Sequence, residues 1–333
     1  MNPVRSLSEA FTEKDYSKCG SIIDSIDISK LENNMRRGFI SLSLRFFFAT
    51  KNYEPFECIM NSDFNLMKRD YLLYCNYLYH TNIEKAKIVF SNNIISNEHI
   101  LPSDIDFLIE NNFTELIKIL NGYYITCSKK ENEINISKLK RFNVVKREEE
   151  IISHFINLIN SSLSKVFNID LFISKVMSAD VLIDGGNVLF CQTDKNIENL
   201  INTFSLSLVN FKNPLIIIHQ RHKKLMSKNG FYSKNEKNIY LTPFDVYDDY
   251  FLILGMIMNK IPIITNDKFR DHIFEIFKIF DRKNNQLSNY IKEMTLSYNQ
   301  FMIENVSTYS KCIQFDDNYI YIPTKSGFYK MEY

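Results

Sequence analysis

The sequence predicts a protein of two architectures, an N-terminal α-solenoid of helical hairpins and a C-terminal α/β domain with a parallel sheet. Three observations support this prediction. The first 125 residues contain many apolar stretches of helical length and no good alternation of period two. Three similar ten-residue segments in that region begin 30 residues apart. Beyond residue 180, short apolar runs alternate with helical segments, as parallel strands covered on both faces do.

The composition is that of a folded globular protein with no strong overall charge. The 333 residues are 45% hydrophobic and 24% charged, which suits two or three domains. Because the formal net charge is only +1, a nucleic-acid site would have to be a local basic patch. The six cysteines are scattered without a CxxC pair, and we expect them to be reduced.

No segment of the sequence has the character of a membrane anchor. The apolar runs fall short of the roughly 18 residues that a membrane span needs, and the N-terminus lacks the hydrophobic core of a signal peptide. We therefore expect no membrane partner and an intracellular, soluble protein. The cytoplasm is the first expectation, with an organelle or the nucleus left open, and nothing indicates an oligomeric state.

The repeated segments in the N-terminal part are "KNYEPFECIM" from Lys51, "TNIEKAKIVF" from Thr81 and "NNFTELIKIL" from Asn111. Each has Asn and then an apolar residue at its second and third positions, followed by a short amphipathic helix. A weaker fourth copy lies near Asp15. A period of this size is typical of stacked helical hairpins with a long concave face. The alternative is an ordinary helical bundle whose spacing is accidental.

The C-terminal part is predicted to contain parallel strands, each followed by a helix. The predicted strands are 181–184, 214–219, 239–243 and 261–265, and the predicted helices are 195–210, 247–259 and 268–280. A further helix is expected from residue 148, with acids in its first turn, where the helix dipole favours them. The last residues, from 311, return to period-two alternation and predict a short β-hairpin.

Four aspartates follow the predicted strands at the edge where ligands bind in open parallel sheets: Asp184, Asp248, Asp249 and Asp267. Each alone has a structural explanation as an Asx-turn or a helix N-cap. Together they would repel one another unless a cation were present. Oxygen ligands without His or Cys favour Mg²⁺ or Mn²⁺. Two such ions, about 3.5–4 Å apart, can activate a water and stabilise the leaving oxygen of a phosphodiester.

Two further features of the sequence point to a polyanionic ligand. Gly185 and Gly186 follow Asp184 directly, where the absence of a Cβ would give room for a phosphate and metals, and Asn187 could orient a ligand or water. Residues 219–237 form a basic segment, predicted as a loop, whose cations could contact phosphates. The alternative is a solvated, mobile loop.

The C-terminal part contains three motifs within residues 178–280, "VLIDGGNV", "PLIIIHQR" and "DDYFLILGMIMNKIPIITNDKFRDHIF". In order and spacing they resemble the NYN-type (PIN-like) metallonuclease domain of protein-only RNase P. The resemblance implies a metal-dependent endoribonuclease that removes the 5′ leader of precursor tRNA without an RNA subunit. It implies that the four aspartates are catalytic and bind Mg²⁺ or Mn²⁺, with two ions expected.

The resemblance also implies supporting residues and a domain plan. The family's "RDH" corresponds to Arg270, Asp271 and His272, and its "H.R" to His219 and Arg221. The residues expected to contact RNA are His219, Arg221, Lys223, Lys224 and Lys228. The expected domains are a repeat array over 1–124 that resembles pentatricopeptide repeats, a split central module over 125–150 and 305–333, and the nuclease over 151–304.

The sequence departs from the family at the structural zinc site of the central module. The family binds this zinc through a CxxC pair with a C-terminal His and Cys. Here Lys130 stands where the second Cys after Cys127 should be, Tyr321 stands in place of the His, and no last Cys follows. We therefore expect no structural zinc and a hairpin held by apolar residues such as Ile320, Ile322 and Phe328.

Two other functions remain open at this level. The repeats are about 30 residues long and few, shorter than the family's, so the nuclease could act on another structured RNA. In the second alternative the protein binds tRNA without cleaving it.

Overall fold

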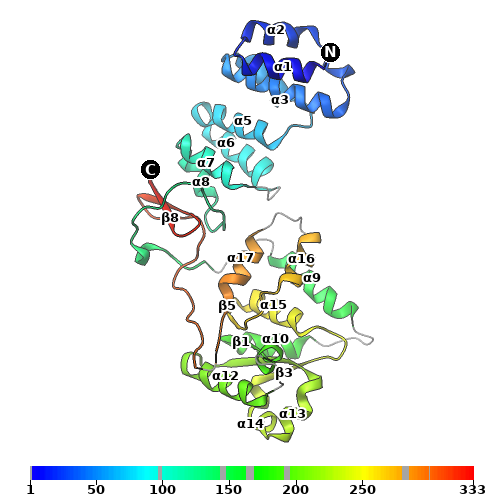
Figure 1. Ribbon diagram of the computed structural model, residues 1–333, viewed down its shortest axis with the longest axis vertical. Helices are drawn as coiled ribbons and strands as arrows, with labels where there is room; N and C mark the ends of the chain where they lie inside the picture. The colour runs from blue at the N-terminus through cyan, green and yellow to red at the C-terminus, as the bar shows by residue number, and fades with distance from the viewer. Residues whose placement is uncertain are drawn as a thin grey trace. The chain divides into compact units, whose positions relative to one another are not determined.

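The computed structural model describes residues 2–96, 100–142, 148–162, 169–190, 196–279, 285–299 and 301–333. These form two compact units, which are described separately (Figure 1). Cys191 and parts of four predicted segments (residues 143–147, 163–168, 195 and 280) lie outside the described residues. None of the described helices combines the length and the apolar character needed to cross a membrane.

The first unit contains helices that pack in consecutive pairs, α1 with α2, α3 with α4, α5 with α6, and α7 with α8 (Figure 1). The helices are α1 (Pro3–Thr12), α2 (Tyr16–Ser25), α3 (Asn33–Ala49), α4 (Tyr53–Met60), α5 (Lys68–Thr81), α6 (Ile83–Phe90), α7 (Pro102–Glu110) and α8 (Thr114–Ile119), with short turns η1 (Ile28–Lys30) and η2 (Ser91–Ile95). The four pairs are the hairpins that the repeated segments predict, and those segments begin α4, α6 and α8.

The second helices of the pairs share one buried position. The fourth residue of each is fully buried, and these residues are Cys19, Phe56, Ala86 and Ile117. This alignment corrects the predicted register of the third copy by one residue. Asn52 and Asn82 precede their helices directly, whereas Asn112 is a turn residue and Phe113 takes the position of Asn52.

Three of the turns inside these hairpins have a left-handed residue that is not glycine. Lys14, Lys51 and Asn112 have φ values of 58°, 56° and 56°. In each case the next residue donates a backbone hydrogen bond to a carbonyl five residues earlier, as when Asn52 N donates to Phe47 O over 2.9 Å. This bond closes the first helix and redirects the chain into the second.

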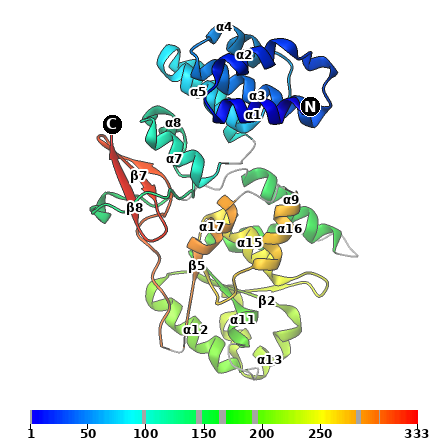
Figure 2. The same ribbon diagram turned by 45° about the horizontal axis from the view of Figure 1, so that its top comes forward.

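A small antiparallel sheet completes the first unit, in the order β6 (Gln314–Phe315), β7 (Tyr319–Pro323), β8 (Phe328–Glu332). β7 and β8 are the predicted hairpin (Figure 2), and Ile320, Ile322 and Phe328 are buried in it. The segment 125–133 joins this sheet, because Cys127 N donates to Pro323 O over 2.8 Å and Asn132 N donates to Phe328 O over 3.0 Å.

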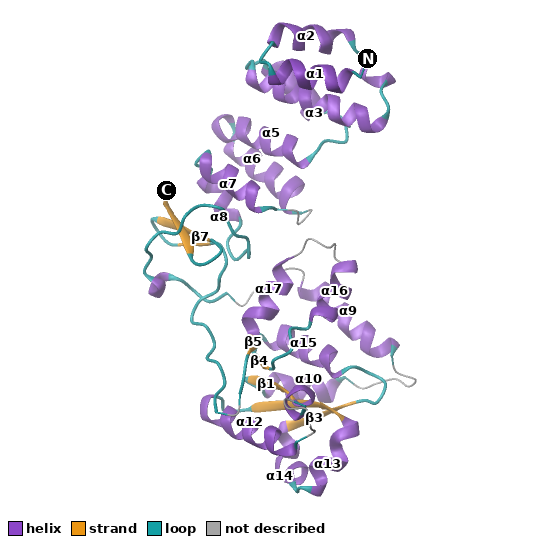
Figure 3. Ribbon diagram, in the orientation of Figure 1, coloured by secondary structure: helices purple, strands orange, loops and turns teal. Residues whose placement is uncertain are grey.

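The second unit is built on a five-stranded parallel sheet in the order β3-β2-β1-β4-β5 (Figure 3). The strands are β1 (Val181–Asp184), β2 (Pro214–His219), β3 (Ile239–Thr242), β4 (Ile263–Ile264) and β5 (Thr295–Leu296). The chain runs from β1 to β3 on one side and then returns to β4 on the other. The order therefore reverses between β1 and β4, which is where ligands bind in such sheets.

Helices cover both faces of the sheet, which explains why its strands are apolar at successive positions. The helices are α9 (Glu148–Ser161), α10 (Asp170–Ser178), α11 (Gly185–Leu189), α12 (Ile197–Asn210), α13 (Lys223–Lys228), α14 (Phe231–Asn235), α15 (Asp248–Asn259), α16 (Arg270–Ile279) and α17 (Asn285–Met294). Leu182 packs in the core with α9, α10 and α15. Val181 and Ile183 point to the opposite core, with α11 and α12.

Several features of this unit differ from the prediction. Helices α10, α11 and α17 were not predicted. Strand β5 was not predicted. The basic segment 219–237, predicted as a loop, is instead largely helical, with η4 (Gln220–His222), α13 and α14 in succession and η5 (Glu236–Asn238) leading into β3. The remaining short turn of the chain is η3 (Ile136–Lys138).

Candidate active site

Asp184 is the buried centre of the site. It ends β1 and caps α11, and its side chain is held by two donors. Asn187 N donates to Oδ1 over 2.9 Å and the Thr265 hydroxyl donates to Oδ2 over 2.7 Å. Burial, reinforced by the charges of Asp249 and Asp248, raises the pKa of Asp184 to about 7, although the two hydrogen bonds oppose this shift.

Asp248 comes from the first turn of α15 and faces the same place as Asp184. A Cβ on Gly186 would lie 3.1 Å from Asp248 Oδ2 and 3.6 Å from Asp184 Oδ1. Burial and the neighbouring charge of Asp249 raise the pKa of Asp248, while His219 and Arg221 oppose the shift. Two carboxylates from different elements therefore meet beside the backbone of Gly186.

Asp249, the next residue of α15, is held by a histidine from α16. The Nε2 of His272 lies 2.8 Å from Asp249 Oδ2. The two preceding residues of the expected "RDH" triplet, Arg270 and Asp271, have exposed side chains. Of this triplet, His272 is the residue that contacts a predicted catalytic aspartate.

Asp267 follows β4 and is exposed, unlike Asp184. Its Oδ1 accepts from Phe269 N over 2.8 Å, and its backbone N donates to the Thr265 hydroxyl oxygen over 3.0 Å. Thr265 therefore links the loop of Asp267 to Asp184, because its hydroxyl also donates to that carboxylate.

The two glycines have different roles, which corrects the expectation that both give room to a substrate. A Cβ on Gly185 would lie 2.7 Å from the Cβ of Ile218, so this glycine is required for packing on β2. Gly186 is the one beside the carboxylates. Asn187 is also engaged within the protein, since its Oδ1 accepts from Asn266 N and from the Tyr298 hydroxyl, both over 3.0 Å. It ties the loop after β4 to α11.

His219 differs from its expected role as an RNA contact. It is buried, its Nδ1 accepts from Arg221 N over 3.1 Å, and its Nε2 lies 3.0 Å from Phe244 O. Because Nδ1 accepts, Nε2 carries the hydrogen and donates to that carbonyl. His219 therefore positions the segment before Asp248 rather than facing solvent.

The cations of η4 and α13 are exposed. The side chains of Arg221, Lys223, Lys224 and Lys228 all reach solvent. The Nζ of Lys223 lies 4.9 Å from the ring centre of Tyr232. A role of these side chains in RNA binding stays a prediction.

All four aspartates lie after strands at the carboxyl edge of the sheet, but they do not form a closed coordination shell. Across the described ranges, no three His, Cys, Asp or Glu side chains are arranged to hold one metal ion. The structural support around the acids was not predicted. The sequence could have indicated Thr265, because this residue directly ends an apolar run, whereas no local pattern indicated Tyr298.

In the small sheet, Tyr321 stands at the position where the family has a zinc-binding histidine, and it forms a polar pair with Asp316. The Tyr321 hydroxyl donates to Asp316 Oδ2 over 2.7 Å. Cys127 is buried, and burial raises the pKa of its thiol.

Comparisons with known proteins agree on one family. The family model "Protein-only RNase P" matches residues 120–332. "Proteinaceous RNase P 2" of Arabidopsis thaliana is 26% identical over 111 residues, which cover 29% of this chain but only 21% of that relative.

Two solved structures of the nuclear protein-only RNase P 2 of A. thaliana have the same fold. The first has a TM-score of 0.62 at 13% sequence identity, and the match covers 93% of this chain and 81% of the chain of that structure. The second has a TM-score of 0.57 at 14% sequence identity, and the match covers 98% of this chain and 96% of the chain of that structure. The likeness extends over both the helical array and the α/β domain.

Proposed function

The chain belongs to the protein-only RNase P family of metal-dependent ribonucleases, and from this premise we propose that it removes the 5′ leader of precursor tRNA. The products would be a tRNA with a 5′-phosphate and a leader with a 3′-hydroxyl. The observation that carries the proposal is the meeting of Asp184 and Asp248 beside Gly186, at the point where the strand order reverses.

The carboxylates suit Mg²⁺ or Mn²⁺, and we propose two ions. The donors are hard oxygens, and Asp184 is buried beside two further acids whose charges raise its pKa. A divalent cation would relieve this repulsion. Among the described residues, no Lys or Arg side chain donates a hydrogen bond to Asp184 and so neutralises its charge. Asp184, Asp248 and Asp249 would hold metal, with Asp267 completing the site. The metal would supply an activated water and stabilise charge on the phosphodiester.

The remaining residues would orient the acids and hold the RNA. His272 fixes the carboxylate of Asp249, and Thr265 and Asn187 fix Asp184 and the loop of Asp267. The exposed lysines of α13 would contact phosphates. We further propose that the hairpins over 1–124 grip the tRNA body, with 125–150 and 305–333 as a connecting module and 151–304 as the nuclease.

To test the proposal, the protein is freed of copurified RNA and incubated with a labelled precursor tRNA in the presence of Mg²⁺, and cleavage is measured. We expect one cut at the leader junction, a 5′-phosphate on the tRNA, and no cleavage by Asp249→Asn or Asp267→Ala, both of which should still bind the RNA. Cleavage at other positions would indicate a different RNA substrate, and binding without any cleavage would contradict an enzymatic role.

A further inference from the structure

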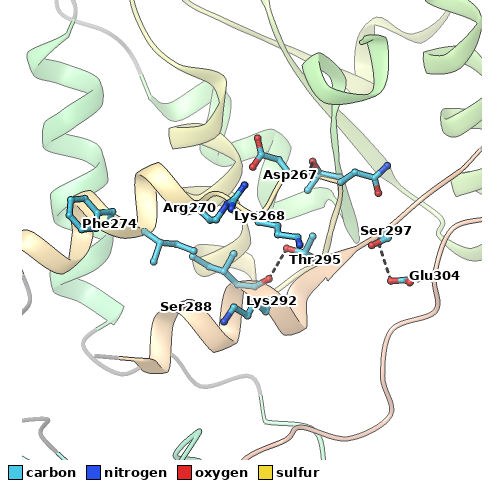
Figure 4. A pocket seen from close by; sticks show the side chains of 13 residues that line it. Asp267, Lys268, Arg270, Phe274, Ser288, Lys292, Thr295, Ser297 and Glu304 are labelled. Carbon is cyan, nitrogen blue, oxygen red and sulfur yellow. Dashed lines mark hydrogen bonds between the residues drawn. The ribbon is translucent and has the colours of Figure 1, made fainter. Parts of the chain in front are cut away.

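A pocket opens beside the acids, between α16, α17 and the ends of β4 and β5 (Figure 4). We call it the α16–α17 pocket. Its volume is about 570 Å³, within the range of about 300–1,000 Å³ that ligand pockets have. Ile273 and Ile291 give it an apolar, buried floor, and Phe274, whose side chain is 49% exposed, forms part of its wall.

The pocket adjoins the acids of the proposed site. Thr265 lines it, and the same Thr265 hydroxyl donates to Asp184 over 2.7 Å. Asp267 lines it as well. The pocket therefore begins at one of the four acids and is one hydrogen bond away from a second.

The charge of the pocket favours an anion. Three cations line it, Lys268, Arg270 and Lys292, and all three are exposed. In the part of the chain that the structure describes, none of them has a carboxylate within ion-pair distance. Of the two acids in the lining, Glu304 accepts a hydrogen bond from Ser297 N and Asp267 accepts one from Phe269 N.

We propose that the α16–α17 pocket binds the nucleotides of the 5′ leader nearest the cleaved bond, an inference that rests on the proposed function. The three cations would contact leader phosphates, and an unpaired base would lie on the apolar floor beside Phe274. A cationic rim with an aromatic side chain is the combination that holds single-stranded nucleic acid without reading its sequence.

The geometry favours the leader over the other parts of the RNA. The pocket takes a nucleotide, whereas the base-paired acceptor stem is too wide to enter it. Two single-stranded parts remain, the leader and the 3′ end. The leader is bonded directly to the phosphate that is cut, so its last nucleotide would lie next to the acids, where the pocket begins at Asp267.

The experiment compares RNAs that differ only in the leader. Binding of mature tRNA and of precursors with short and longer leaders is measured in a chelator, so that the RNA stays intact. The variants are Lys292→Glu and Phe274→Ala. The matched control is Lys212→Glu, the same change on an exposed lysine two residues before β2, at the opposite edge of the sheet.

We expect the unaltered protein to bind leader-bearing RNA more tightly than mature tRNA. Lys292→Glu and Phe274→Ala should each weaken binding of leader-bearing RNA about five- to tenfold and leave mature tRNA nearly unaffected. Lys212→Glu should not remove the preference for a leader. A 4-thiouridine at the last leader position should crosslink to residues 268–274 or 288–295.

Other results would overturn the inference. If the variants lost as much affinity for mature tRNA as for leader-bearing RNA, the 3′ end or the tRNA body would lie in the pocket. If they lost no affinity for either RNA, RNA would not enter the pocket. Cleavage of the same RNAs is measured in parallel. A protein that cleaves them but shows no preference for a leader retains its proposed function and loses only the pocket. If the protein cleaves none of these RNAs, the proposed function itself is refuted.

Discussion

His272 and Asp249 form a direct contact between two helices, with 2.8 Å between Nε2 and Oδ2. His272 also packs against the ring of Tyr250, with 5.1 Å between ring centres. Asp249 is less buried than Asp184, and His272 provides a hydrogen-bonding partner for its carboxylate. The orientation of one acid on α15 thus depends on a side chain from α16.

We predict that His272→Ala lowers the rate of cleavage about 10- to 100-fold, because the residue that orients a metal ligand is removed. RNA affinity should stay within about twofold, since the ring does not reach the RNA in our proposal. Single-turnover cleavage at saturating protein separates the two quantities. His272→Gln retains a donor and should recover part of the rate; if it is as slow as His272→Ala, the hydrogen bond is not what matters.

The two adjacent glycines should respond in opposite ways to alanine. In Gly185→Ala the new Cβ would meet Ile218 at 2.7 Å, so we expect a loss of about 1–3 kcal/mol in the free energy of unfolding. In Gly186→Ala the nearest atom is Asp248 Oδ2, at 3.1 Å, so stability should change less while cleavage falls. Urea unfolding and cleavage are measured on both. Equal destabilisation of the two variants would contradict this assignment.

The raised pKa of Asp184 predicts a pH-dependent stability. The pKa rises from 3.8 to about 7 on folding, so the folded protein binds this proton more tightly than the unfolded chain. The resulting stabilisation is complete below about pH 4 and is lost as the pH rises through about 7. In a chelator at pH 8, Asp184→Asn should therefore exceed the natural protein in stability by on the order of 1–4 kcal/mol.

The control for this prediction is the same comparison near pH 4, where the difference should vanish. Mg²⁺ at pH 8 should raise the melting temperature of the natural protein but not that of Asp184→Asn. A constant difference across the pH range would mean that the carboxylate of Asp184 is not strained by its charge.

The small sheet should be stable without metal. The Tyr321–Asp316 pair stands where the family has a zinc-binding histidine, so a chelator should leave the unfolding of the first unit unchanged and purified protein should contain no stoichiometric zinc. Tyr321→Phe should cost about 1 kcal/mol, the net value of a hydrogen bond. Tyr329→Phe on β8 is the matched control. Stoichiometric zinc in metal analysis would refute the expectation.

The lysines of α13 should contribute to affinity without affecting the chemistry. Lys223→Glu with Lys224→Glu should weaken RNA binding and reduce the slope of log affinity against log salt by about two, one for each lost phosphate contact. Lys330→Glu with Lys325→Glu, in the first unit, is the control for total charge. A salt slope that stays the same would show that α13 does not reach the RNA.

The strands β1 to β4 and the four hairpins could be predicted because their signal is local. A strand buried on both faces must be apolar throughout, and a repeat shows itself by its period. Strands β4 and β5 both have only two residues, but β4 lies in an apolar run, whereas no such run surrounds Thr295 and Leu296. The helices α13 and α14 were missed because segments of six and five residues are too short to establish a helical period.

At the site, the sequence located the acids but not what holds them. Parallel topology alone places Asp184 and Asp267 at one edge of the sheet. The hydrogen bond from Tyr298 to Asn187 joins residues 111 positions apart, and no local pattern announces it. The packing role of Gly185 depends on side chains of β2, so it could not be seen in the glycine pair itself.

The left-handed conformations of Lys14, Lys51 and Asn112 lower the thermal stability of the helical array. A residue with a Cβ costs about 1 kcal/mol more than glycine in this conformation, yet the chain uses only eight glycines in all. Protein engineers who need a hardier protein could therefore begin at these three bends and leave every acid of the proposed active site as it is.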